Sequence, residues 1–495
     1  MKRDIFACIL LLVFFIICSA PQYAQNLAWP QFRGINCSGI AAENQDPPTS
    51  FAKDQNMIWN TSLSVGQSSP CIWNDNIFIT GFEEEEKKLQ MYCIDRSNGA
   101  INWLKEISVD EFEKVHAVSS PANATPATDG ERVVFYFSSY GLLCYDNEGN
   151  MLWELPMKVP QSQHGMGTSP VIHEDLVILN CFGHVNDPHL LAINKYDGKI
   201  VWKQSSTTQE DTPPDSYSSP VVYGDQIIIY RNEDVSGYNI KTGDRIWRFQ
   251  TGVQDAIGTP VIGDDKLYVI VYSQAGNLDM RNQFPDFIEL LSEYDENQDM
   301  KISKEEGAGF TFLMDPEKPV QGSMTLAAAS GFWDKNNDSL IDSTEWKFLE
   351  IFLESFYQKQ GIKAIKLGGE GDVTIEHFLW GSTDNVPHVT SPLIYKNRVY
   401  MIRSGGILSC FQADKGNLLF YERIGAAGAY FASPVASNGR IYFASRNGII
   451  TVIEADSELK ILDRNDLDEI IAATPAIVDN KIYIRTEHSL YAFGD

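Results

Sequence analysis

SSPCIW (68–73) is the first of eight short stretches in which a small residue and a proline open an apolar run. The other copies are NATPAT (123–128), GTSPVI (167–172), YSSPVV (217–222), GTPVIG (258–263), TSPLIY (390–395), ASPVAS (432–437) and ATPAIV (473–478). Successive prolines lie 56, 44, 50, 40, 132, 42 and 41 residues apart. A period of roughly 40–50 residues is typical of propeller blades. We therefore expect eight blades, with an insertion in the long interval.

Within most repeats a glycine precedes an aromatic residue by four positions, in a polar turn between the third and fourth predicted strands. The pairs are Gly99–Trp103, Gly149–Trp153, Gly198–Trp202, Gly243–Trp247 and Gly416–Phe420. Glycine accepts the positive φ that such a turn needs, and the recurrence of the aromatic favours packing between blades over ligand binding. The last repeat lacks a fourth strand, which the segment around Trp59 can supply. Closure of this kind removes exposed sheet edges.

The proline strand followed by a D-x-x-x-G-x-x-x-W turn, cleanest at Asp95–Trp103, resembles the pyrroloquinoline-quinone-like (PQQ-like) propeller repeat. Quinoprotein alcohol dehydrogenases and the propeller lipoprotein of the outer-membrane assembly machinery share this repeat. The stretch WPQFRG (29–34) is similar to the leader of exported bacterial members. The resemblance implies an all-β, eight-bladed β-propeller closed by its N- and C-terminal strands. It implies architecture more strongly than activity.

The composition indicates an acidic, globular protein, and the N-terminal segment indicates export. Hydrophobic residues make up 43% of the chain, and the net charge of −27 disfavours nucleic acid as a partner. Lys2 and Arg3 precede an uncharged run (5–17) that is too short to span a bilayer and matches a secretory h-region. We expect a signal peptide (1–24), no transmembrane span after cleavage, and a periplasmic or secreted protein; the alternative is a retained anchor. Corresponding strand positions in separate blades indicate buried thiols rather than disulfides for Cys93, Cys144 and Cys410.

The long interval carries two stretches that match the twelve-residue EF-hand loop, DENQDMKISKEE (295–306) and DKNNDSLIDSTE (334–345). Calcium ligands are expected at places 1, 3, 5, 7, 9 and 12, with a backbone carbonyl at place 7. These places hold Asp295, Asn297, Asp299, Lys301, Ser303 and Glu306 in the first loop, and Asp334, Asn336, Asp338, Leu340, Asp342 and Glu345 in the second. Place 8 is isoleucine in both, as loops that pair side by side require. Place 6 holds Met300 and Ser339 instead of the usual glycine, which costs about 1 kcal/mol or more.

Helical spacing precedes the first loop and follows the second, so we expect an inserted α-helical EF-hand pair. The predicted organisation is a signal peptide (1–24), a first propeller part (25–275), the EF-hand pair (276–366) and a second propeller part (367–495). The insertion follows the second strand of blade five, and GDVTIEHFLW (371–380) is expected to supply strands three and four. The module should therefore stand over the face that carries the connections into the proline strands. The alternative is an acidic loop pair that binds no cation.

The same face gathers candidates for a ligand site. Connections between blades contribute His164, Tyr217, Asp255, His388 and Tyr430, and loops after second strands contribute Arg231, Arg403, Arg446 and Arg485. Four arginines in an acidic protein could form a ring that binds a carboxylate or another small anionic ligand. The alternative is structural, with the arginines bridging blades through acidic partners such as Glu233 and Glu487.

These observations favour an exported, calcium-binding propeller that acts as a binding or scaffold protein for a protein partner or a small anion. The alternative is a PQQ-dependent quinoprotein oxidoreductase of the alcohol dehydrogenase type, in which calcium polarises the quinone. The resemblance implies adjacent cysteines against the quinone in such enzymes, and the chain has no Cys-Cys pair. A hydrolase with His164 or His388 as base is a third interpretation, but no nucleophile elbow or zinc-spaced histidine pair accompanies them.

Overall fold

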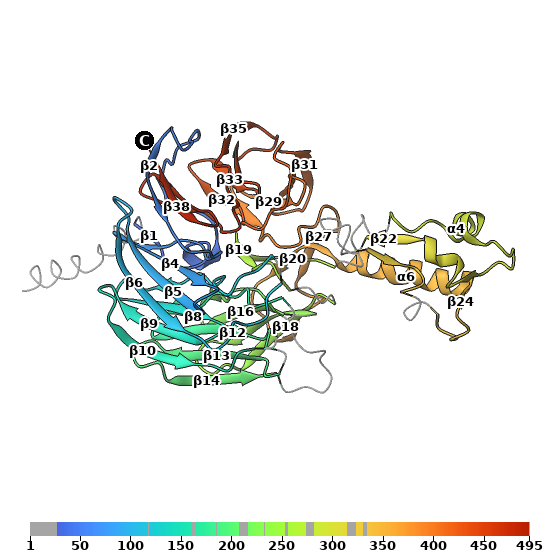
Figure 1. Cartoon of the computed structure of the whole chain (residues 1–495), viewed down its shortest axis with the longest axis horizontal. Helices are drawn as coiled ribbons and strands as arrows, with labels where there is room; N and C mark the ends of the chain where they lie inside the picture. Colours follow the sequence, from blue (N-terminus) through green and yellow to red (C-terminus); the bar gives the residue numbers. More distant parts are fainter. Residues whose placement is uncertain are drawn as a thin grey trace, which may run out of the picture.

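Eight β-sheets follow one another around a closed ring in the computed structural model, and a smaller unit extends outward from one of them (Figure 1). The structure describes residues 27–116, 118–160, 162, 164–184, 186–206, 216–231, 233–252, 256–273, 282–313, 323–329 and 334–494. The predicted signal peptide lies outside these residues. None of the described helices is long and apolar enough to cross a membrane.

The first four blades each contain four antiparallel strands in chain order. Blade 1 contains β3 (Cys71–Trp73), β4 (Asn76–Glu83), β5 (Lys88–Asp95) and β6 (Ile101–Ser108), with β1 (Ala28–Trp29) on its inner edge. Blade 2 contains β7 (Ala127–Thr128), β8 (Arg132–Phe137), β9 (Gly141–Asp146) and β10 (Met151–Pro156). Blade 3 contains β11 (Val171–His173), β12 (Leu176–Cys181), β13 (His189–Asn194) and β14 (Ile200–Ser205). Blade 4 contains β15 (Val221–Tyr223), β16 (Gln226–Arg231), β17 (Asp234–Asn239) and β18 (Arg245–Gln250).

The other four blades complete the ring. Blade 5 contains β19 (Val261–Gly263), β20 (Lys266–Val271), β25 (Gly361–Lys366) and β27 (Phe378–Ser382). Blade 6 contains β28 (Leu393–Tyr395), β29 (Arg398–Arg403), β30 (Ile407–Gln412) and β31 (Leu418–Arg423). Blade 7 contains β32 (Val435–Ser437), β33 (Arg440–Ala444), β34 (Ile449–Glu454) and β35 (Ile461–Asp466). Blade 8 contains β36 (Ala476–Val478), β37 (Lys481–Arg485), β38 (Ser489–Phe493) and β2 (Met57–Ser62).

The ring closes as the sequence predicts. The early strand β2 pairs with the last strand β38, and Trp59 stands opposite Ala492. The chain ends are thereby held in one sheet, which removes a free edge. The all-β, eight-bladed propeller with closure by both termini is confirmed.

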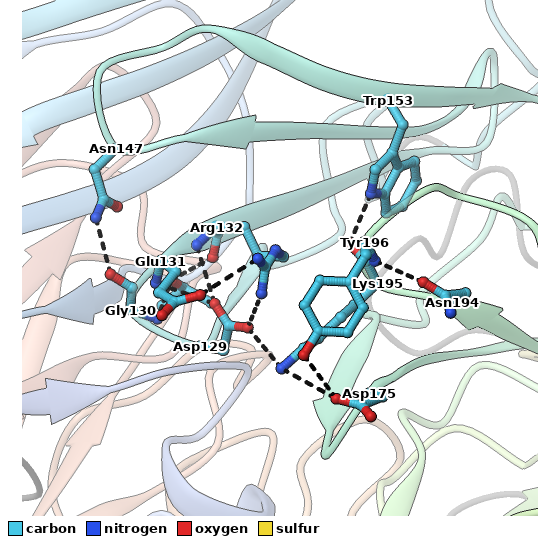
Figure 2. A network of polar contacts seen from close by, with 11 residues as sticks. Asp129, Gly130, Glu131, Arg132, Asn147, Trp153, Asp175, Asn194, Lys195 and Tyr196 are labelled. Atoms are coloured by element: carbon cyan, nitrogen blue, oxygen red, sulfur yellow. Dashed lines mark hydrogen bonds and ion pairs between the residues drawn. The ribbon is translucent and has the colours of Figure 1, made fainter.

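Fourth-strand tryptophans join neighbouring blades. Trp153 of blade 2 donates its Nε1–H to the backbone oxygen of Lys195 in blade 3 at 2.8 Å (Figure 2). A Cβ added to Gly198 would lie 2.8 Å from the Trp153 ring, so the turn needs glycine for close approach as well as for its φ of 71°. The predicted packing role of these aromatics is confirmed. Trp247 is the exception, because β26 (Gly371–Asp372) pairs in parallel with β18 and Trp247 bonds Gln226 of its own blade.

The small residue before each proline forms a second joint between blades. Its hydroxyl accepts a hydrogen bond, at 3.0–3.1 Å, from the backbone N–H of the equivalent residue in the preceding blade. We name this closed circle the hydroxyl ring; its members are Ser69, Thr125, Ser169, Ser219, Thr259, Ser391, Ser433 and Thr474. Each is buried. The repeated motif therefore aligns the innermost strands of neighbouring blades, because the hydroxyl of each copy satisfies the backbone N–H of the copy before it.

The insertion has its own core and departs in part from the predicted helical pair. It contains α4 (Phe287–Tyr294), β21 (Ile302–Ser303), the 3-10 turn η2 (Glu306–Gly309), β22 (Thr311–Leu313), β23 (Ser323–Thr325), β24 (Leu340–Ile341) and α6 (Ser343–Lys359). The outer helices lie where the spacing places them, and Trp346 packs with Leu290 and Phe310 between them. Between the two loops, the described residues form the hairpin β22–β23 rather than helices.

The insertion leaves the propeller between strands two and three of blade 5, as predicted, but the later boundary differs. The third strand is β25, which pairs with β20, so the propeller resumes at residue 361 rather than 367. The stretch 371–376 leaves blade 5 to reach β18, and β27 supplies the fourth strand alone. In Figure 1 the insertion extends outward beyond the outline of the propeller instead of covering the ring.

The described cysteines are all free and buried; they are Cys37, Cys71, Cys93, Cys144, Cys181 and Cys410. Burial raises the pKa of Cys93, Cys144 and Cys410 to about 12, so these thiols stay protonated and behave as small hydrophobic residues. The expectation of buried thiols at these strand positions is confirmed.

Candidate functional site

The two acidic loops of the insertion lie side by side. Ile302 of β21 pairs with Ile341 of β24 in an antiparallel bridge, as their shared place in the loops predicts. Both isoleucines are buried in the core of the insertion. The backbone of each loop is thereby fixed at its centre, which holds the two sets of acidic side chains in matching orientations.

In the first loop, the terminal carboxylates organise the backbone. Asp295 accepts hydrogen bonds from the N–H groups of Asp299 and Met300, at 3.2 and 3.0 Å. Glu306 reaches back across the loop and accepts from the N–H of Asn297 at 3.3 Å and of Ser303 at 2.8 Å. Met300, at place 6, has a φ of 65°, so the left-handed conformation expected there is adopted without glycine.

The second loop repeats this network position by position. Asp334 accepts from the N–H groups of Asp338 and Ser339, at 3.1 and 3.0 Å, and Ser339 also has a φ of 65°. Glu345 accepts from the N–H of Asn336 at 3.4 Å and of Asp342 at 3.2 Å. Two stretches of different sequence therefore adopt one loop geometry, which is set by the acidic residues at places 1 and 12.

Hydrogen bonds favour the charged form of two carboxylates in these loops, Glu306 and Asp338. Backbone and hydroxyl hydrogen bonds from Ser303 lower the pKa of Glu306, and the backbone N–H of Leu340 together with Lys301 lowers that of Asp338. Lys301 and Asp338 form an ion pair between the loops at 3.1 Å. Across the described residues, no group of three His, Cys, Asp or Glu side chains alone converges as a metal site. The loops instead combine carboxylate, amide, hydroxyl and backbone oxygens, the hard ligand set that suits calcium.

On the propeller, two of the four predicted arginines are buried and bonded to other propeller residues. Arg231 forms a two-point ion pair with Asp234, at 3.1 and 2.9 Å, and is 4% exposed. Arg485 is 1% exposed and donates to the backbone oxygens of Ser64 and Gly66, which joins blade 8 to the connection into blade 1. Both arginines serve structure, although their partners are not the predicted Glu233 and Glu487.

The other two arginines stay closer to the surface. Arg403 donates from Nε to Asn385 at 2.7 Å. The guanidinium of Arg446 lies 5.4 Å from the ring of Phe431, and its buried Nε has no hydrogen-bond partner among the described residues. The four arginines therefore engage different partners among the described residues.

Of the predicted histidines and tyrosines, the structure brings His164 and Tyr217 together, while His388 and Tyr430 contact other residues. The His164 ring lies 5.9 Å from that of Tyr217 and 5.4 Å from that of His116. His388 stacks on Tyr272 with ring centroids 4.2 Å apart. Tyr430 is buried and donates to the backbone oxygen of Ala426 in its own connection. Asp255 lies outside the described residues.

Sequence reasoning missed a buried acid on this face. Glu113, in the connection between blades 1 and 2, is 5% exposed and accepts a hydrogen bond from Ser138, while its Oε2 is buried without a partner among the described residues. Burial raises its pKa to about 8, so the carboxyl is largely protonated at neutral pH. No sequence signal could single it out, because no other blade repeats it and its burial depends on blade 2.

The fold defines the class of this protein, a closed eight-bladed propeller, and its repeats resemble those of the PQQ-like family. A family model described as outer membrane protein assembly factor BamB matches residues 113–284. The outer membrane protein assembly factor BamB of Moranella endobia is 22% identical over 403 residues, which are 78% of this chain and 84% of that protein. The resemblance to the PQQ-like repeat family, expected from the sequence, is confirmed.

Solved structures share the same architecture. BamB from Moraxella catarrhalis matches with a TM-score of 0.51 and 11% identity, over 89% of this chain and 99% of that one. A europium-containing methanol dehydrogenase matches with a TM-score of 0.58 and 11% identity, over 95% of this chain and 98% of that one. At these identities the likeness shows the fold alone, and this fold serves both an assembly factor and a dehydrogenase.

The described residues do not fit a bound quinone. The arginines that could hold its carboxylates engage protein partners or stand apart, and the described cysteines are single and buried. We therefore derive no redox step for this chain.

Proposed function

We propose that this protein is an exported, calcium-binding propeller that acts as a binding or scaffold protein for a protein partner. One observation carries the calcium assignment. The two loops share a hydrogen-bond network at places 1, 3, 5, 9 and 12, although they differ in sequence at most other places. Acidic residues that only faced solvent would not require the same hydrogen-bond network in both loops. Extracellular modules of this kind bind calcium at roughly 10⁻⁴ to 10⁻³ M.

The binding role draws on the propeller. Tryptophan hydrogen bonds such as that of Trp153 join its blades into one ring, and its fold occurs in a protein named for outer membrane assembly. A partner protein would meet loops that differ from blade to blade on a rigid ring. The predicted signal peptide supports a periplasmic or secreted location, which cell fractionation tests.

Calorimetry of the mature protein tests the calcium assignment. We expect two equivalents of calcium for the wild type, one for Glu306→Gln or Glu345→Gln, and none for the double variant, because the place-12 carboxylate supplies two oxygens. Glu305→Gln, which alters the exposed neighbour of Glu306, is the matched control and should keep two. Absence of calcium heat in the wild type at millimolar concentration would refute the proposal.

The dehydrogenase alternative has its own test. Purified protein is mixed with the quinone and calcium and assayed for dye-linked alcohol oxidation. We expect neither a spectral shift of the quinone nor turnover. Turnover that depends on both additions would replace the binding role with catalysis.

A further inference from the structure

The leader segment crosses the central channel of the propeller. β1 pairs with β3 in blade 1, the Asn36 side chain accepts from the N–H of Val222 in blade 4, and the N–H of Ala41 donates to Ala436 in blade 7. These blades lie on different sides of the ring, so a continuous segment that touches all three must pass across the channel. The leader therefore closes one end of it.

Arg33 in this leader lies beside the hydroxyl ring. Its Nη2 donates to the backbone oxygens of Pro392 and Pro434, at 2.9 and 3.3 Å. These prolines directly follow Ser391 and Ser433, two members of the ring. The guanidinium is thus held one residue away from the circle of hydroxyls.

The positive charge of Arg33 has no counter-ion among the described residues. The side chain is 0% exposed, and its Nε and Nη1 have no hydrogen-bond partner there. The ionisable group that acts on it is the Cys37 thiol, whose pKa is raised to about 11 by burial, so this thiol is neutral. A buried charge without compensation costs several kcal/mol, which an anion would offset.

The hydroxyl ring offers further donors. Each hydroxyl oxygen already accepts an N–H, and its own hydrogen donates to no acceptor among the described residues. The leader is also strained where it presents Arg33, since Arg33 and Cys37 have φ values of 59° and 55°. Non-glycine residues held in this region occur preferentially at functional sites.

We propose that the channel binds a small inorganic anion of the halide class between Arg33 and the hydroxyl ring. The free Nε and Nη1 donors lie on different edges of the guanidinium, so they do not form the two-point fork that holds a carboxylate or phosphate. A spherical ion needs no such fork, because it can accept from one of these N–H groups together with hydroxyl donors of the ring. The site is independent of calcium and of any partner, because the insertion does not contribute to it.

Bromide tests the site directly. Crystals of the full mature chain grown in sodium bromide should show an anomalous peak in contact with the Arg33 guanidinium. In solution, the melting temperature should be higher in chloride or bromide than in gluconate at equal ionic strength. Absence of a peak in the channel, or equal melting temperatures in the three salts, overturns the proposal.

Arg33→Met should lose the halide dependence of the melting temperature, whereas Arg423→Met, at an exposed arginine, should retain it. A halide effect of unchanged size in Arg33→Met contradicts the assignment. If Arg33→Met does not fold, the bromide crystal of the wild type decides the question.

Discussion

The propeller and the insertion are both built by repetition, eight copies in one and two in the other, but they satisfy their polar groups differently. In the propeller, Trp153 and Ser433 each bond the neighbouring blade, so every copy completes another copy. In the insertion, Glu306 and Glu345 each turn back and accept hydrogen bonds from the backbone of their own loop. Closure therefore needs nothing beyond the chain, whereas the loop pair presents charges that a cation would complete.

The largest effect should come from breaking a joint between blades. Trp153→Ala should lower the free energy of unfolding of the propeller by about 3–5 kcal/mol, because it leaves a cavity and removes the bond to Lys195. Trp346→Ala, in the core of the insertion, should leave the propeller transition unchanged. Urea unfolding followed by circular dichroism measures both. Equal loss of propeller stability in the two variants would show that the regions are one cooperative unit.

The two regions should respond to pH with opposite sign. Glu113 has a pKa near 4.5 when unfolded and about 8 when folded, so its contribution is complete below pH 4.5 and is lost as pH rises to 8. The propeller should lose about 3 kcal/mol between pH 5.5 and 8. Glu306 and Asp338 have lowered pKa values, so the insertion should lose stability as pH falls below 4.

Glu113→Gln should abolish the pH dependence of the propeller between pH 5.5 and 8, measured by urea unfolding at each pH. Glu111→Gln, at an exposed neighbour, should keep it. A wild-type propeller that is equally stable at both pH values would show that Glu113 is charged in the folded state.

A smaller effect on stability should distinguish two reasons for glycine in these turns, its backbone conformation and the close approach of a neighbouring ring. Gly198→Ala strains a φ of 71° and pushes a Cβ against Trp153, whereas Gly224→Ala strains a φ of 56° with nothing within 4 Å. We expect Gly198→Ala to cost about 2 kcal/mol more than Gly224→Ala in thermal unfolding. Equal costs would mean that the turn needs glycine for its backbone conformation alone.

The smallest effect should follow removal of the insertion. Val271 stands opposite Gly361, so a short hairpin can join β20 to β25 after deletion of residues 274–359. The propeller should keep its β-sheet circular dichroism spectrum and unfold within about 1 kcal/mol of the full chain. A chain that no longer folds would contradict the separation of the two regions.

Repetition explains which features could be predicted. The small-residue–proline motif, the Gly–Trp turns and the two acidic loops each recur along the chain. A recurring residue type indicates the role of a position before any contact is known. The arginines at matching places also recur, but recurrence did not reveal their partners. Arg231 and Arg485 share a place in their blades but bond a carboxylate in one case and backbone oxygens in the other.

The number of blades, their closure by the segment around Trp59 and the two paired loops could be predicted, because they follow from local patterns repeated along the chain. The closed ring of hydroxyl residues, the burial of Glu113 and the entry of Arg33 into the channel appear only in the folded chain. These features join residues that lie far apart in the sequence. Their burial and pairing depend on ring closure, which no single stretch of sequence encodes.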